Sequence, residues 1–210
     1  MKEKSKIGII GGGIIGLTIA YKLKLKFPKS DIYLFEKESG VGAHQSGNNS
    51  GVLHCGLHYL PGSLKARLSV NGVQQMIAFC RDNDIDHELC GKIVVATNNQ
   101  EISGINELAR RGERNGLRGL KFLNKTELKS SLYPSAFIAN AQKMIPDLRD
   151  FMFEKKGTAG VRAQAITEEG SLLNDFKIIK EDNQVHVLNA PSPGATASFA
   201  IADYLIENYV

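Results

Sequence analysis

The chain has 210 residues, of which 42% are hydrophobic and 23% are charged. These proportions are ordinary for a globular protein and exclude a disordered, collagen-like or coiled-coil chain. The net charge of +4 at neutral pH is small and evenly spread, so it predicts no nucleic-acid partner. The three cysteines, Cys55, Cys80 and Cys90, are odd in number and lack CxxC spacing, which argues against a disulfide framework and a structural zinc site.

The sequence contains no apolar run long enough to cross a membrane as a helix. The apolar stretch from Ile7 to Ala20 follows three lysines, but its glycines make a poor composition for the helix of a signal peptide. We therefore expect a cytoplasmic protein without a transmembrane segment, and peripheral contact with an inner membrane stays open.

The first part of the chain predicts a cradle for a dinucleotide. Residues 6–10 form a short apolar run that is typical of a buried parallel strand. A glycine turn follows, then residues 15–27 have apolar side chains at helical spacing before Pro28, and residues 31–36 resemble a second strand. This order of strand, glycine turn, helix and strand gives the GxGxxG motif its specificity.

Each glycine of the motif has a physical reason. Gly11 permits the tight turn, Gly13 lets a pyrophosphate approach the backbone, and Gly16 lets the helix pack against the strand. The phosphates then lie at the N-terminus of the helix, where unpaired N–H groups favour negative charge. Glu36 at the end of the second strand can accept hydrogen bonds from a ribose and disfavours NADP, but the turn alone leaves FAD and NAD open.

Residues 40–59 form a second cluster rich in glycine, serine and asparagine. A nicotinamide-binding domain has no need of a second such loop, whereas the ribityl chain and pyrophosphate of a flavin need further polar partners. Ser46, Asn48, Asn49 and Ser50 have suitable side chains for that purpose. A solvated surface loop is the alternative interpretation.

Five segments carry a resemblance to a known family: the glycine turn at residues 11–16, and residues 35–37, 44–54, 160–165 and 189–196. With these segments the sequence resembles the L-2-hydroxyglutarate oxidase/dehydrogenase family, a branch of the FAD-dependent, D-amino-acid-oxidase-like superfamily. The resemblance implies an α/β fold, with a Rossmann-like FAD-binding domain that starts as β-α-β. It also implies that the C-terminal helix, expected at residues 195–207, returns to the flavin.

The resemblance implies FAD as the cofactor and no metal. The first turn and Glu36 then hold the ADP half, the loop from Ser46 to Gly51 lies along the pyrophosphate and ribityl chain, and the segment before the last helix meets the isoalloxazine ring. The implied cofactor-binding residues are Gly11, Gly13, Ile15, Gly16, Glu36, Lys37, Ser46, Asn49, Ser50, Gly51, Pro193, Gly194, Ala195 and Thr196.

The resemblance also implies a large internal deletion, because relatives are considerably longer. We expect residues 1–131 to form the amino-terminal part of the FAD-binding domain and residues 132–210 to complete it. Most of the antiparallel substrate domain is then missing.

Further helices and a strand are expected after the second glycine cluster and before the proposed deletion. Hydrophobic spacing predicts helices at residues 63–81 and 101–115 and a strand at residues 92–97. In the second of these helices, Arg110, Arg111 and Arg114 are expected on the outer, solvated side.

Three residues are candidates for chemistry. His54 or His58 could accept the hydroxyl proton of a substrate, or either could be a hydrogen-bonded structural histidine. Their spacing of four would suit a metal on a helix, but the surrounding glycines indicate an irregular backbone instead. Arg162 could bind a substrate carboxylate, or form a structural ion pair with Asp175 or Glu168.

The resemblance therefore implies FAD-dependent oxidation of a small 2-hydroxy dicarboxylate, with L-2-hydroxyglutarate becoming 2-oxoglutarate. Oxygen or a membrane quinone would take the electrons from the flavin. Two alternatives stay open, an inactive truncated remnant that binds flavin weakly or not at all, and an NAD-binding module.

Overall fold

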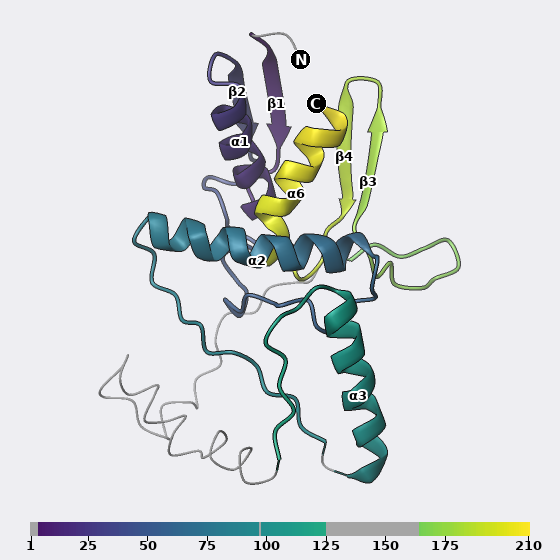
Figure 1. The fold of residues 1–210 in the computed structure, drawn as a ribbon. Helices are drawn as coiled ribbons and strands as arrows, with labels where there is room; N and C mark the ends of the chain where they lie inside the picture. Colours follow the sequence, from purple (N-terminus) through teal and green to yellow (C-terminus); the bar gives the residue numbers. More distant parts are fainter. Residues whose placement is uncertain (1–3, 97, 125–163) are drawn as a thin grey trace. The chain divides into compact units, whose positions relative to one another are not determined.

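The computed structural model describes three stretches of the chain, residues 4–96, 98–124 and 164–210. Figure 1 shows their helices and strands. The chain divides into two compact units, of which one joins residues 1–118 to residues 160–210 and contains every element described below. The predicted boundary between residues 131 and 132 lies outside the described residues and stays a prediction.

The chain begins with the predicted β-α-β unit. Strand β1 (Lys6–Ile10) pairs in parallel with β2 (Asp31–Phe35), and α1 (Ile14–Lys26) connects them. Gly11 has a φ of 106°, a conformation that favours glycine. A Cβ at Gly16 would collide with the carbonyl oxygen of Gly11, so the helix can approach the turn only because this residue is glycine. The prediction for this unit is confirmed.

Helix α6 (Gly194–Tyr209) returns to the first strand and helix, as predicted, and contacts both α1 and α2 (Leu64–Asp82) (Figure 1). Most of its small side chains are buried, Ala197 and Ala202 completely, and Ile206 packs with Ile9 of β1 and Leu23 of α1. The three helices form most of the described core, and their close approach brings the two ends of the chain together.

Polar contacts fix the order of these three helices. Lys22 on α1 donates hydrogen bonds to Asp203 on α6 at 3.0 Å and to Gln75 on α2 at 3.3 Å. The Thr18 hydroxyl on α1 donates to the carbonyl oxygen of Ser198 on α6 at 3.2 Å. Because these partners come from distant parts of the sequence, they select one arrangement of helices that hydrophobic packing alone would specify less sharply.

The N-terminus of α2 is capped from two directions. The Ser63 hydroxyl accepts a hydrogen bond from the N–H of Ala66. The carboxylate of Asp175, from the far end of the chain, accepts from the N–H groups of Leu64 at 3.0 Å and Lys65 at 2.7 Å. A negative charge at this helix end stabilises α2 and ties it to the chain that precedes β3.

Strands β3 (Lys177–Glu181) and β4 (Gln184–Asn189) form an antiparallel hairpin that the sequence analysis missed. Its turn includes Asp182, whose φ is 48°. Alternating apolar residues on both sides of an Asp-Asn pair were the available signal. The side chain of Asn189 then joins the hairpin to the preceding segment, since it donates to the carbonyl oxygens of Leu173 and Asp175.

Helix α3 (Asn99–Arg114) confirms the prediction for that region, with Asn98 accepting from the N–H of Glu101 as its cap. The predicted strand at residues 92–97 is wrong for residues 92–96, which have no regular secondary structure. A strand requires a neighbour that completes its backbone hydrogen bonds, and none of the described strands lies alongside this segment.

The described residues cover the sheet of β1 and β2 on one face only. Ile7, Ile9 and Ile32 lie in or against the core cluster, whereas Ile10 on the opposite face is 93% exposed and Phe35 is 57% exposed. Parallel sheets in proteins are normally covered on both faces. The described residues therefore contain one half of the layered arrangement that such a sheet requires.

None of the helices in the described residues has both the length and the apolar composition that crossing a membrane requires.

We predict that Gly72→Ala destabilises the protein, because α2 lies directly against the backbone of α6 at this residue. A Cβ there would lie 2.7 Å from Cα of Ala197 and closer still to the carbonyl oxygen of Thr196. The free energy of unfolding, measured in urea, should fall by about 1–3 kcal/mol. Gly104→Ala on α3 is the control, since its Cβ would meet open space. That change should raise the free energy by up to about 1 kcal/mol, and equal effects of the two changes would contradict the prediction.

Candidate functional site

The N-terminus of α1 is built to receive oxygen atoms. Its N-cap residue, Gly13, has no side chain to accept hydrogen bonds, and its first turn has no acidic residue. The Ser46 hydroxyl, from the second glycine cluster, accepts from the N–H of Ile14 at 2.8 Å. A Cβ at Gly13 would lie 3.2 Å from that hydroxyl oxygen, so glycine keeps this space open. The arrangement suits a phosphate oxygen, because N–H groups and the helix dipole both favour negative charge.

The Glu36 carboxylate lies beside this turn. Its Oε1 accepts from the N–H of Glu38 at 3.0 Å, and its Oε2 accepts from the N–H of Gly12 at 2.6 Å. These backbone hydrogen bonds, that from Glu38 first, hold the pKa of Glu36 below its usual 4.5. An ionised carboxylate has about four lone-pair sites, so it can still accept from the hydroxyl groups of a ribose.

The polar loop of the second cluster is organised largely by its own side chains. Asn49 donates to the carbonyl oxygen of Ser46 at 2.8 Å and accepts from the N–H of Gly51 at 2.8 Å. Lys37 forms an ion pair with Glu38 at 3.3 Å, and Ser50 is exposed. Of the loop residues predicted to bind a cofactor, Ser46 is the one that reaches the N-terminus of α1. The binding roles of all of them stay predictions.

The N-terminus of α6 lies beside that of α1. A Cβ at Gly194, the first residue of α6, would lie 3.7 Å from Cδ1 of Ile15 in the first turn of α1. Like α1, α6 has neither a capping side chain nor an acidic residue in its first turn. Segments from opposite ends of the chain therefore place two helix N-termini together, which favours an extended ligand with more than one electron-rich group.

The structure connects His54 to this place. Its backbone N–H donates to the hydroxyl oxygen of Thr196 in α6, at 3.0 Å. Two residues predicted from separate motifs, one for catalysis and one for cofactor binding, are thus brought into direct contact.

His58 lies in a cationic environment. Its Nε2 is 2.8 Å from Nζ of Lys92, and its carbonyl oxygen accepts from Nη1 of Arg111 at 3.2 Å. Partial desolvation of this otherwise exposed residue is the main cause that holds the pKa of His58 below its usual 6.5, followed by the charges of Lys92, Arg111 and His54. A neutral imidazole whose Nε2 accepts from the Lys92 ammonium cannot take a substrate proton at that nitrogen.

Arg111 corrects one expectation and reveals a group that sequence reasoning missed. It was expected on the solvated side of its helix, yet its side chain is only 32% exposed and contacts the segment of His58. Asn115, which follows α3, donates to the carbonyl oxygens of Gly56 and Tyr59. These residues lie more than fifty positions from their partners, so no local sequence pattern could identify them.

Arg162 and its alternative partner Asp175 are the remaining predicted site residues. Arg162 lies outside the described residues, and its predicted role is not tested. Asp175, offered as its alternative partner, uses both carboxylate oxygens to accept backbone N–H groups at the start of α2. Within the described stretches, no group of three or more His, Cys, Asp or Glu residues is arranged to hold a metal ion.

Comparison with known proteins identifies similarity over the amino-terminal part. A family model described as DAO, FAD dependent oxidoreductase, matches residues 6–137. The L-2-hydroxyglutarate dehydrogenase of Indibacter alkaliphilus is 47% identical over 121 residues, which cover 58% of this chain and 30% of that protein. The mitochondrial L-2-hydroxyglutarate dehydrogenase of Nematostella vectensis is 43% identical over 127 residues, which cover 60% of this chain and 28% of that protein.

A solved structure is also similar, that of dithionite-reduced L-α-glycerophosphate oxidase from Mycoplasma pneumoniae with FAD bound. It has a TM-score of 0.49 and 26% identity, covering 60% of this chain and 33% of that one. The chain thus spans about a third or less of the length of the proteins it matches.

We predict that the pKa of His58, measured by NMR titration, lies below 6.5 and rises toward that value in Lys92→Gln, which removes a neighbouring positive charge. The same pKa difference makes stability depend on pH. The unfolded chain takes up this proton first, so the free energy of unfolding decreases as the pH falls from above 6.5 through the pKa of the folded protein.

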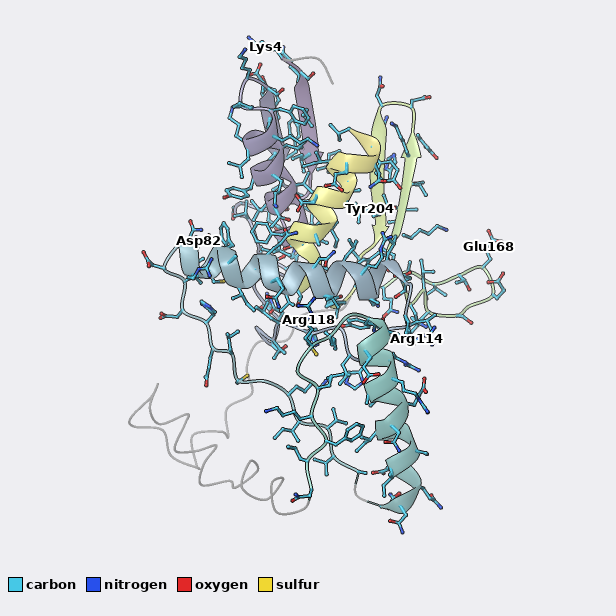
Figure 2. The ribbon with its side chains drawn as sticks, in the orientation of Figure 1. Lys4, Asp82, Arg114, Arg118, Glu168 and Tyr204 are labelled. Atoms are coloured by element: carbon cyan, nitrogen blue, oxygen red, sulfur yellow. The ribbon has the colours of Figure 1, made fainter. Side chains whose placement is uncertain are left out.

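Arg114→Gln is the control for this titration, because Arg114 is an exposed cation in the last turn of α3, the helix that carries Arg111 (Figure 2). It should leave the pKa of His58 unchanged. A pKa of 6.5 or above in the unaltered chain would contradict the assignment of its environment.

Proposed function

Because the chain belongs to the DAO family of FAD dependent oxidoreductases, we propose that it binds FAD and contains the cofactor-binding part of an enzyme that oxidises the CH–OH group of a 2-hydroxy acid. The substrate we propose is L-2-hydroxyglutarate, which becomes 2-oxoglutarate. The names of the relatives, L-2-hydroxyglutarate dehydrogenases, support the choice of substrate. The observation that carries the proposal is the meeting of two helix N-termini, neither of which is capped by the side chain of its own N-cap residue, with Glu36 beside the turn before α1.

The residues present fit the cofactor. The turn from Gly11 to Gly16 and the Ser46 hydroxyl at the start of α1 can hold the pyrophosphate, and Glu36 can hold the adenosine ribose. A side chain at Gly12 would meet Glu36 and Val41 at 3.0 Å, so the turn has no room for one. The N-terminal amides of α6 favour negative charge and so suit a reduced flavin ring. FAD, when bound, supplies an acceptor for the hydride that leaves the substrate carbon.

We assign the role of base to His54. Its backbone contact with Thr196 holds it at the N-terminus of α6, where the flavin end of the cofactor is proposed to lie. A neutral imidazole there accepts the hydroxyl proton as the C–H electrons leave, and the C–O bond becomes a carbonyl. His58 is less suited, because its Nε2 contacts the Lys92 ammonium. Oxygen or a membrane quinone is the proposed final electron acceptor.

We expect Glu36→Ala to weaken the binding of FAD by about tenfold or more, because a charged hydrogen-bond acceptor to the ribose is lost. Titration of the purified chain with FAD, followed by flavin fluorescence, measures this. Glu38→Ala is the matched control, since it removes an equal charge two positions away. It keeps the backbone N–H of residue 38, which donates a hydrogen bond to the Glu36 carboxylate. Equal affinities in the unaltered chain and Glu36→Ala would overturn the ribose assignment.

The 210-residue chain by itself should show little or no turnover of L-2-hydroxyglutarate even when FAD is bound. Hydride transfer depends on a site that excludes water and holds the reacting atoms about 3–3.5 Å apart. Here His58 and Lys92 are exposed, and one face of the β1–β2 sheet is open. Steady-state reduction of an artificial electron acceptor measures the rate, and a rate typical of a full-length relative assayed in parallel would prove this expectation wrong.

A further inference from the structure

Three basic side chains from separate segments meet outside the cofactor cradle. His58 comes from the segment after the second glycine cluster, Lys92 from the irregular chain before α3, and Arg111 from the last turn of α3. Lys92 Nζ lies 2.8 Å from His58 Nε2, and Arg111 Nη1 lies 3.2 Å from the His58 carbonyl oxygen. His54 is a fourth basic group, close enough to lower the pKa of His58.

Among the described residues, one carboxylate forms an ion pair with one of these three side chains. Glu107, on the same helix, lies 3.9 Å from Arg111, and its carboxylate is shared with Arg110 at 3.3 Å. Two permanent cations therefore lie at His58, Lys92 at the imidazole and Arg111 at the backbone carbonyl oxygen, and the charges of both lower the pKa of the imidazole. A cluster of this kind has a free-energy cost that an incoming anion would relieve, and perturbed groups of this type concentrate at functional sites.

Holding the local chain in place does not require these charges. Asn115 already donates to the carbonyl oxygens of Gly56 at 2.9 Å and Tyr59 at 3.0 Å, on either side of His58. Lys92 lies in a segment without regular secondary structure, and both it and His58 are exposed. An ammonium has three N–H donors and a guanidinium has five, so the two side chains can donate to a ligand as well as to His58.

We propose that His58, Lys92 and Arg111 form a subsite for the substrate carboxylate that lies furthest from the reacting CH–OH group. This inference rests on the proposed function, because it assigns a location to the second acidic group of a dicarboxylic 2-hydroxy acid. His54 is four residues from His58, so the proposed base and the subsite belong to one short segment. The Arg111 guanidinium and the Lys92 ammonium bind the carboxylate, and the Lys92 contact with His58 holds the ammonium in position.

The test compares two ligands that differ only in the distal carboxylate, L-2-hydroxyglutarate and L-2-hydroxyvalerate. Binding to the 210-residue chain is measured by isothermal titration calorimetry, with and without added FAD. We expect the dicarboxylate to bind about tenfold more tightly, which is the contribution of a charged hydrogen bond. Equal affinities, or no detectable binding of either ligand at millimolar concentrations, would overturn the proposal.

Variants test whether the preference for the dicarboxylate comes from Lys92 and Arg111. Lys92→Gln and Arg111→Gln should each remove most of the preference for the dicarboxylate, and Arg111→Lys should restore part of it because the charge returns. Arg114→Gln makes the same change of charge in the same turn of α3 and should keep the full preference. An equal loss in Arg114→Gln would indicate a general charge effect and would refute the subsite.

A second measurement excludes a purely structural role. If a carboxylate binds in the cluster, the pKa of His58 measured by NMR should rise when L-2-hydroxyglutarate is added and should stay unchanged with L-2-hydroxyvalerate. If Arg111→Gln unfolds the chain, as circular dichroism would reveal, Lys92→Gln carries the test, since Lys92 is exposed and lies outside the helices.

The results also separate this inference from the proposed function. A chain that binds no FAD but prefers the dicarboxylate would refute the cofactor proposal and keep the subsite. A chain that binds FAD without preferring the dicarboxylate would refute the subsite and keep the cofactor proposal.

Discussion

The close approach of α6 to α1 and α2 is the contact on which the rest of the structure depends. It requires small residues, since Gly72 meets the backbone of Thr196 and Ala197, and Ala197 and Ile201 are completely buried. The same contact places the N-terminus of α6 beside that of α1 and sets Thr196 where it accepts from His54. Core packing and the geometry of the candidate site therefore have a single physical cause, close packing between helices from opposite ends of the chain.

The fold was predicted best where the signal was local, although the local signal of the β3–β4 hairpin was missed. The β-α-β unit follows from strand patterning, a glycine turn and helical spacing within 36 residues, and all three elements appear where expected. The return of α6 came from a family resemblance, because periodicity reports that a helix is amphipathic or buried and not which helix it contacts. Residues 92–96 show the converse, since their β-type composition describes a strand that finds no partner among the described elements.

The candidate site divides in the same way. Glu36 could be found from the sequence because its distance from the glycine turn is fixed by one helix and one strand, and the carboxylate does contact Gly12. Ser46 is intermediate, since composition identified the loop and tertiary contact decided which of its residues reaches Ile14. The contacts among His58, Lys92 and Arg111 join three segments, so each residue alone resembles an ordinary surface charge.

The uncovered face of the β1–β2 sheet bears on two different requirements of the proposed function. One is binding of the cofactor, and the other is enclosure of the reacting carbon of the substrate. The cradle beside Gly13 and Glu36 is built from adjacent elements and the returning α6, all of which are present and packed. Enclosure of a reacting carbon needs further layers, and the described residues leave one face of the β1–β2 sheet open, with Ile10 93% exposed. Binding of a cofactor requires mainly the cradle, whereas hydride transfer requires both the cradle and an enclosure of the reacting carbon. The two properties therefore depend on different parts of the fold.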